Sequence, residues 1–144
     1  MTKNNLKIFI ADTDNYWTFA YRQLLHVLGY KKIYTFRDTE SCINNLVLKP
    51  DVLFLNFSLI NFFGLEVLNK IKSIYPQIKV VFISEMDEMN SALASLKFGE
   101  YEFVLKGSDE EERIETVLDE ISSNKEDENQ KSSSAWQKIA SLFL

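Results

Sequence analysis

The apolar residues of the chain fall into five short runs, separated by longer segments in which apolar residues recur at helical spacing. The runs predict strands over residues 6–11, 32–36, 51–56, 78–84 and 102–106, of which the second is more polar and is expected nearer an edge of the sheet. The other segments predict helices from Asn15 up to Gly29 and over about residues 39–48, 64–75, 88–98 and 109–121. This alternation favours an α/β fold in which right-handed crossovers join parallel strands.

Local signals indicate how the first two helices begin, end and face the core. Asp14 is placed to cap the first helix, and Gly29 is expected to end it. The apolar positions expected to face inward in the first helix are Phe19, Leu24, Leu25 and Leu28. Those expected to face inward in the second helix are Ile43, Leu46 and Val47.

The stretch from Asp51 to Ser58 organises the rest of the chain. It follows Pro50 and is apolar until Asn56, which predicts a strand buried on both faces. In an open parallel sheet, ligands bind outside the carboxyl ends of the strands. Asn56 therefore holds the position from which this chain would carry out its chemistry, although an amide is a poor choice of group for that work.

The composition of the chain changes after Ile121. Residues 122–134 are polar, charged and rich in serine, which is typical of a linker. Residues 135–144 form a short amphipathic segment that includes Trp136. We therefore expect a domain over residues 1–121, a linker over residues 122–134, and a C-terminal segment over residues 135–144 with which an output module would begin.

Composition and charge exclude several classes of function. The chain has 144 residues and a formal net charge of −5, which argues against a nucleic-acid surface on this chain. No apolar run reaches the ~18 residues of a membrane span, and the first residues lack the form of a secretion signal. Cys42 is the only cysteine, which excludes an internal disulfide and suits a reducing compartment. These features predict a cytoplasmic protein that contacts neither membrane nor nucleic acid.

Four stretches of the chain resemble the receiver domain of two-component response regulators. They are Lys7–Asp14, Pro50–Asn56, Val80–Ser84 and Tyr101–Lys106. Their spacing extends the resemblance from Lys7 to about Ile121. The resemblance implies a flavodoxin-like fold, which is a doubly wound (βα)5 three-layer sandwich with parallel strand order 2-1-3-4-5.

The resemblance also implies a site. Receiver domains accept a phosphoryl group from a histidine kinase onto an aspartate that ends the third strand. Two acids after the first strand help to hold Mg²⁺, a hydroxyl and a lysine contact the phosphoryl oxygens, and an aromatic residue changes rotamer with the state. These roles would fall to Asp12 as the first acid, Ser84 as the hydroxyl, Lys106 as the lysine and Phe103 as the aromatic residue.

Four positions depart from the family pattern. Asn56 stands at the phosphoacceptor position, and a neutral carboxamide cannot attack phosphorus usefully as a carboxylate does. Thr13 replaces the second acid, so one metal-binding carboxylate is missing. Glu85 stands where the family usually has a small residue that leaves room for the phosphoryl group. Gly107 replaces the proline that usually follows the lysine.

These departures change the charge of the pocket. Three carboxylates and one lysine give an ordinary member −2, which matches Mg²⁺, whereas Asp12 and Lys106 sum to zero. We therefore expect weak or no Mg²⁺ binding, no other cofactor and no catalytic residue. The Lys106 ammonium should then turn to Asp12, with the Asn56 amide bridging the two groups. Alternatively, Asp12 and Lys106 are a leftover ion pair and not a site.

Two apolar surfaces are candidates for protein contacts. The loop beside the pocket carries Leu59, Ile60, Phe62 and Phe63, which either cover the strand ends or form a partner surface. The segment around Trp136 is too short to be a stable helix alone, so it should dock on its own domain, a second copy or another protein. We therefore expect a protein partner or self-association.

The sequence leaves several functions open. We expect a receiver-like signalling module, not an enzyme, that works through protein contacts without phosphorylation. One alternative is a conventional receiver that uses Ser58 or Ser84 as acceptor, with a histidine kinase as its partner. Another is the regulatory domain of a DNA-binding transcriptional regulator whose output domain begins near Ala135. An unrelated enzyme with this fold is the weakest alternative, because the chain has no Gly-rich phosphate loop.

Overall fold

The computed structural model describes residues 5–59, 68–85, 102–107 and 109–142, and for residues 126–136 it describes the backbone only. The strands are β1 (Lys7–Ala11), β2 (Lys32–Phe36), β3 (Val52–Asn56), β4 (Lys79–Ser84) and β5 (Glu102–Leu105). The labelled helices are α1 (Asn15–Val27), α2 (Thr39–Asn44) and α5 (Glu110–Ser141). Short 3-10 turns follow at Leu46–Leu48 and Phe57–Leu59, and residues 68–74 are also helical.

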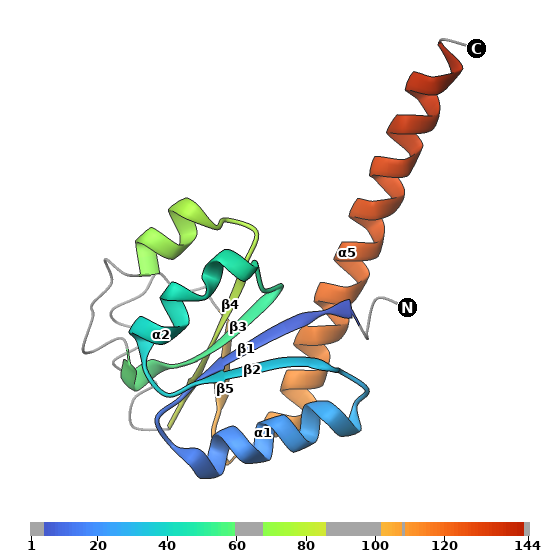
Figure 1. The fold of residues 1–144 in the computed structure, drawn as a ribbon. Coiled ribbons are helices and arrows are strands. Elements are labelled where there is room, and N and C mark those ends of the chain that lie inside the picture. The colour runs from blue at the N-terminus through green and yellow to red at the C-terminus, as the bar shows by residue number, and fades with distance from the viewer. Residues whose placement is uncertain (1–4, 60–67, 86–101, 108, 143–144) are drawn as a thin grey trace.

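The strands form one parallel sheet in the order β2-β1-β3-β4-β5. α1 and α5 cover one face of this sheet, and α2 and the helical residues 68–74 cover the other (Figure 1). The flavodoxin-like fold predicted from the alternation of strands and helices is thus confirmed. The order also places the carboxyl ends of β1, β3 and β4 side by side, where a doubly wound sheet binds its ligands.

β3 lies at the centre of the sheet, and all of its residues are buried. Its side chains alternate between the two faces, as the strand period of two requires. Leu53 and Leu55 pack with the cluster under α2, whereas Val52 and Phe54 pack with the cluster under α1 and α5. Packing on both faces of the sheet therefore holds β3, and with it Asn56 at its end, in place.

α1 begins as predicted but faces the core differently. The Asp14 side chain accepts a hydrogen bond from the Tyr16 amide at 2.9 Å, which confirms the cap. The prediction that Phe19 faces inward is wrong, because its side chain is 65% exposed. Leu25 is buried as predicted, and Tyr21 is buried in place of Phe19. Tyr21 and Leu25 lie four residues apart on one face, and Phe19, two residues before Tyr21, points away from that face.

The second helix is shorter than predicted. α2 ends at Asn44, and residues 46–48 form a 3-10 turn instead of a further α-helical turn. Leu46 is buried as predicted, but Val47 is 67% exposed, so its prediction as a core residue is wrong. The 3-10 turn has three residues per turn in place of 3.6, which changes the direction of side chains relative to an α-helix.

The last helix is longer than predicted. It was expected to end near Ile121, but α5 continues without a break to Ser141, so residues 122–134 are helical and not an irregular linker. Lys125 lies beyond the predicted end, and its ammonium nitrogen is 3.1 Å from Asp51 Oδ1. The other oxygen of this carboxylate accepts a hydrogen bond from the Lys7 backbone amide. Past this ion pair, the helix runs away from the sheet (Figure 1).

Some predictions fall outside the described residues. The helix predicted over residues 88–98 lies there entirely, as does the first part of the helix predicted over residues 64–75. In the part of the chain that the structure describes, no helix combines the length and apolar character needed to cross a membrane.

Candidate functional site

Four polar side chains gather where the strands end. Asp12 follows β1, Asn56 ends β3, Ser84 ends β4 and Lys106 follows β5. Asp12, Asn56 and Ser84 are buried, and the Lys106 side chain is only 5% exposed. The strand order therefore brings together the first acid, the phosphoacceptor position, the hydroxyl and the lysine that the sequence predicted as site positions.

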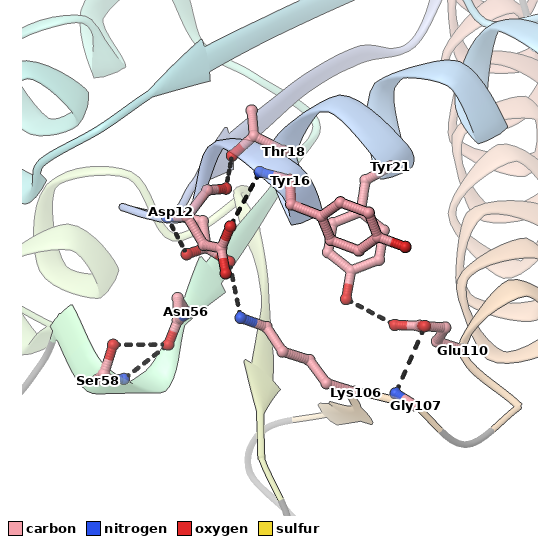
Figure 2. Close-up of polar contacts among 10 residues, drawn as sticks. Asp12, Tyr16, Thr18, Tyr21, Asn56, Ser58, Lys106, Gly107 and Glu110 are labelled. Carbon is pink, nitrogen blue, oxygen red and sulfur yellow. Dashed lines mark hydrogen bonds and ion pairs between the residues drawn. The ribbon is translucent and has the colours of Figure 1, made fainter.

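Lys106 and Asp12 form a buried ion pair, with 3.1 Å between the ammonium nitrogen and Asp12 Oδ2 (Figure 2). The Asp12 side chain is fully buried. Its Oδ1 accepts a hydrogen bond from the Asp14 amide at 2.9 Å. No hydrogen bond between the described residues reaches Oδ2, so the Lys106 ammonium holds it by charge and proximity. The predicted turn of Lys106 toward Asp12 is therefore present.

The Asn56 side-chain amide bonds to a different partner from the one predicted. Its Oδ1 accepts hydrogen bonds from the Ser58 amide at 2.9 Å and from the Ser58 hydroxyl at 2.8 Å. A bridge from Asn56 to Asp12 and Lys106 is not among the hydrogen bonds of the described residues. The reason is local, because the turn after β3 brings Ser58 to the amide oxygen. Figure 2 shows Asn56 directed toward Ser58.

Trp17 contributes to the site, although sequence analysis did not single it out. The Lys106 ammonium lies 5.3 Å from the centroid of the Trp17 ring, within the range of a cation–π contact. Tryptophan is the side chain that favours such contacts most. The lysine is thus held between a carboxylate and an aromatic face.

Tyr21 and Glu110 also lie near the site and were missed. The Tyr21 hydroxyl donates to Glu110 Oε2 at 2.7 Å, and Glu110 Oε1 accepts from the Gly107 amide at 3.4 Å. Burial, and then the neighbouring Glu110 carboxylate, raise the pKa of Tyr21 well above its ordinary value. The hydroxyl therefore keeps its proton and remains a donor. The only sequence signal was the helical spacing of Trp17 and Tyr21, four residues apart.

The other predicted positions lie as follows. Thr13 is exposed, and Ser84 Oγ is buried without a hydrogen-bond partner in the part of the chain that the structure describes. The Phe103 ring packs against Phe82, with 5.4 Å between ring centroids. Gly107 has a φ of +80°, which proline cannot adopt, so the chain takes a path here that the family residue would forbid.

The predicted rim is only partly described. Leu59 is 3% exposed and belongs to the core under α2, so for this residue the first of the two alternatives holds, and it packs inward and is not part of a partner surface. The 3-10 turn after β3 directs this side chain into the core. Ile60, Phe62 and Phe63 lie outside the described residues, and the Trp136 side chain also does.

Mg²⁺, which the resemblance implied, does not fit the side chains at this edge. Asp12 offers the only carboxylate among the four positions, and both of its oxygens are engaged, by the Asp14 amide and by Lys106. Asn56 is neutral. Among the described residues, no group of three or more histidine, cysteine, aspartate or glutamate side chains could hold a metal ion. Mg²⁺ needs carboxylate or phosphate oxygens that are free to bind it.

The chain is similar to several regulators along part of its length. The luminescence regulatory protein LuxO of Vibrio campbellii and the regulatory protein LuxO of Vibrio parahaemolyticus are each 26% identical to it over 88 residues. These residues are 60% of this chain and 19% of each relative, so the chain spans about a fifth of the length of these relatives.

Solved structures share the fold. A response regulator receiver domain protein from Clostridium thermocellum aligns with a TM-score of 0.71 at 18% identity, over 84% of this chain and 97% of that one. NtrX from Brucella abortus, solved in complex with ATP, aligns with a TM-score of 0.70 at 23% identity, over 88% of this chain and 28% of its own. The profile of the response regulator receiver domain matches residues 8–118, which is most of the chain. Together with the strand order and the polar strand ends, this match shows that the chain belongs to the receiver domain family of two-component response regulators.

Proposed function

We propose that this receiver domain transmits its signal through protein contacts and is not phosphorylated. The observation that carries the proposal is Asn56 at the end of β3, where its amide oxygen is occupied by Ser58. A carboxamide offers no effective nucleophile for phosphoryl transfer. The ion pair between Lys106 and Asp12 adds support, because it already neutralises the charge that would otherwise attract a phosphoryl group.

The alternative acceptors are poorly placed for this chemistry. A hydroxyl needs a base within hydrogen-bond reach to take its proton. Ser84 Oγ is buried and has no hydrogen-bond partner among the described residues. The Ser58 hydroxyl donates to the Asn56 amide, which is not a base. A conventional receiver that uses either serine is therefore the weaker proposal.

Treatment with acetyl phosphate and Mg²⁺ is expected to leave the intact mass of the chain unchanged. The reason is that the acceptor carboxylate and the second metal-binding acid are both missing. The triple variant Thr13→Asp/Asn56→Asp/Glu85→Ala, in the same buffer, serves as the positive control. A stoichiometric gain of one phosphoryl group by the unaltered chain would contradict the proposal.

The end of α5 supports a role in protein contacts. Residues 137–142 are all exposed, and they include Ile139 at 47% and Leu142 at 80% exposure. The end of a helix that leaves its apolar side chains in water gains little from folding, because most helical stability comes from packing. We therefore propose that this end of α5 packs against a second copy of the chain or against another protein.

The double variant Ile139→Ser/Leu142→Ser is expected to lose this association. Both changes replace exposed apolar side chains with polar ones, which removes the driving force for burial. Sedimentation velocity would show the unaltered chain as a dimer, or as a complex with an added partner protein, and the variant as a monomer. Val27→Ser is the matched control, because Val27 is 83% exposed on another helix. Equal sedimentation of all three proteins would refute the proposed contact.

Regulation of an output module beyond α5 is a second proposed function. The LuxO proteins are regulators, and this chain spans about a fifth of their length. α5 reaches Ser141 as one continuous helix, so a movement at its first residue could be passed along its axis. A DNA-binding output remains one form that such a module could take.

A further inference from the structure

α1 contacts the chain on both sides of the corner between β5 and α5. Trp17 and Tyr21 lie one helical turn apart on α1, with 5.8 Å between their ring centroids. Trp17 meets Lys106, the residue immediately after β5, and Tyr21 meets Glu110, the first residue of α5. Trp17 and Tyr21 of α1 therefore touch the pocket lysine and the start of the last helix, and Figure 2 shows the second of these contacts, between Tyr21 and Glu110.

Glu110 contacts the backbone at this corner. Gly107 and Asp109 have φ values of +80° and +48°. Residues other than glycine rarely adopt a positive φ such as that of Asp109. Asp109 is the N-cap of α5, but its side chain makes no capping hydrogen bond to the described residues of the helix. The Glu110 carboxylate instead accepts from the Gly107 amide and from the Tyr21 hydroxyl. Proline at position 107 could not donate the first of these bonds.

The Tyr21 and Lys106 side chains are shielded from water, whereas Glu110 is half-buried. Tyr21 is 3% exposed and the Lys106 side chain is 5% exposed. A hydrogen bond to a charged group in such a place is stronger than one at the surface. Only three residues separate Lys106 from Glu110 along the chain. Displacement of one therefore strains the contacts of the other.

We propose that Tyr21 and Glu110 form a latch that holds the Lys106 ammonium on Asp12, so that opening the pocket and displacing the start of α5 are one coupled event. This inference rests on the proposed function, since it gives an unphosphorylated receiver a route between its pocket and its last helix. Coupling between two sites is reciprocal in free energy. Loss of the Tyr21–Glu110 contact should therefore loosen the Lys106–Asp12 pair, and loss of that pair should loosen the start of α5.

The first test measures the reactivity of Lys106 toward acetic anhydride in the full chain. Trace acetylation at pH 8 is followed by peptide mass spectrometry, with the exposed Lys49 as the internal reference. Tyr21→Phe removes only the hydroxyl, and it should raise the relative rate at Lys106 roughly tenfold, as loss of a hydrogen bond to a charged group predicts. Glu110→Gln removes the charge and should act in the same direction. Tyr34→Phe and Glu111→Gln are the matched controls and should leave the rate unchanged.

Cys42 separates opening of the latch from general loss of stability. Burial raises the pKa of the Cys42 thiol to about 12, and this residue lies in the cluster under α2, across the sheet from Tyr21. Its alkylation by iodoacetamide at pH 8 therefore reports opening of the core. The latch predicts faster labelling of Lys106 with an unchanged rate at Cys42. An unchanged rate at Lys106, or a matching increase at both residues, would overturn the proposal.

The second test runs in the opposite direction. Asp12→Asn weakens the hold on Lys106, and it should speed amide hydrogen exchange in the first turn of α5 severalfold while exchange in α2 stays the same. Exchange in the first turn of α5 at the rate of the unaltered chain would refute the coupling. Neither test involves phosphorylation, so a failed latch and a chain that gains a phosphoryl group are distinguishable results.

Discussion

Replacement of Lys106 by methionine should lower the free energy of unfolding by about 3 kcal/mol. The change leaves the Asp12 carboxylate, whose side chain is fully buried, without its counter-charge. Removal of one partner from a buried pair costs more than removal of both, because the remaining charge has lost its hydration and gains nothing in return. Urea denaturation followed by far-UV circular dichroism measures the difference directly.

Two further variants complete this experiment. The double variant Asp12→Asn/Lys106→Met should recover part of the lost stability, because no buried charge is left unpaired. Lys79→Met is the control at the surface, where Lys79 lies 3.3 Å from Glu102 and its side chain is 42% exposed. Its cost should stay below about 1 kcal/mol. If Lys106→Met lowers the free energy of unfolding no more than Lys79→Met does, the ion pair between Lys106 and Asp12 does not stabilise the pocket.

The single variant Asn56→Asp should still accept a phosphoryl group from acetyl phosphate more than about a hundredfold more slowly than the triple variant Thr13→Asp/Asn56→Asp/Glu85→Ala. A bound metal ion supplies several kcal/mol of charge stabilisation in the transition state, and each 1.36 kcal/mol is a factor of about ten in rate. The single variant restores the nucleophile but not the second acid. In the triple variant, three carboxylates and one lysine restore a pocket charge of −2.

The rate of phosphorylation is measured by intact mass spectrometry over a time course with and without Mg²⁺. Thr13 is exposed, so an aspartate there can be accommodated without a change in the core. The variant Thr13→Asp/Glu85→Ala, which keeps Asn56, is the matched control and should remain unlabelled. Phosphorylation of the single variant at the rate of the triple variant would mean that the missing acid at Thr13 and the presence of Glu85 do not limit the reaction, contrary to the prediction.

The pocket and α5 together suggest how such a receiver would work. In receivers that are phosphorylated, the modification shifts the population between two conformations. A chain that cannot gain this differential binding energy must have its state set by its own sequence or by a partner. We propose that the ion pair at Lys106 and the contact of Tyr21 with Glu110 favour one state of the pocket. A partner bound at α5 would then compete with these contacts.

The sequence by itself determined the fold and the place of the site. Five apolar runs that alternate with helical segments permit few arrangements other than a parallel sheet with crossover helices. The carboxyl ends of parallel strands share one edge, so Asp12, Asn56, Ser84 and Lys106 had to lie near one another. The pairing of Lys106 with Asp12 was expected from their opposite charges.

Only the tertiary structure decided which contacts surround these groups. Tyr21 and Glu110 are 89 residues apart, and their contact depends on how α1 and α5 pack on the sheet, which no local pattern encodes. The same packing decided that Tyr21 and not Phe19 faces the core. The length of α5 escaped prediction because residues 122–134 lack apolar periodicity, although several of them favour helices. The tertiary structure also decided the partner of Asn56. The turn after β3 brings the Ser58 amide and hydroxyl next to the Asn56 side-chain oxygen, which accepts hydrogen bonds from both.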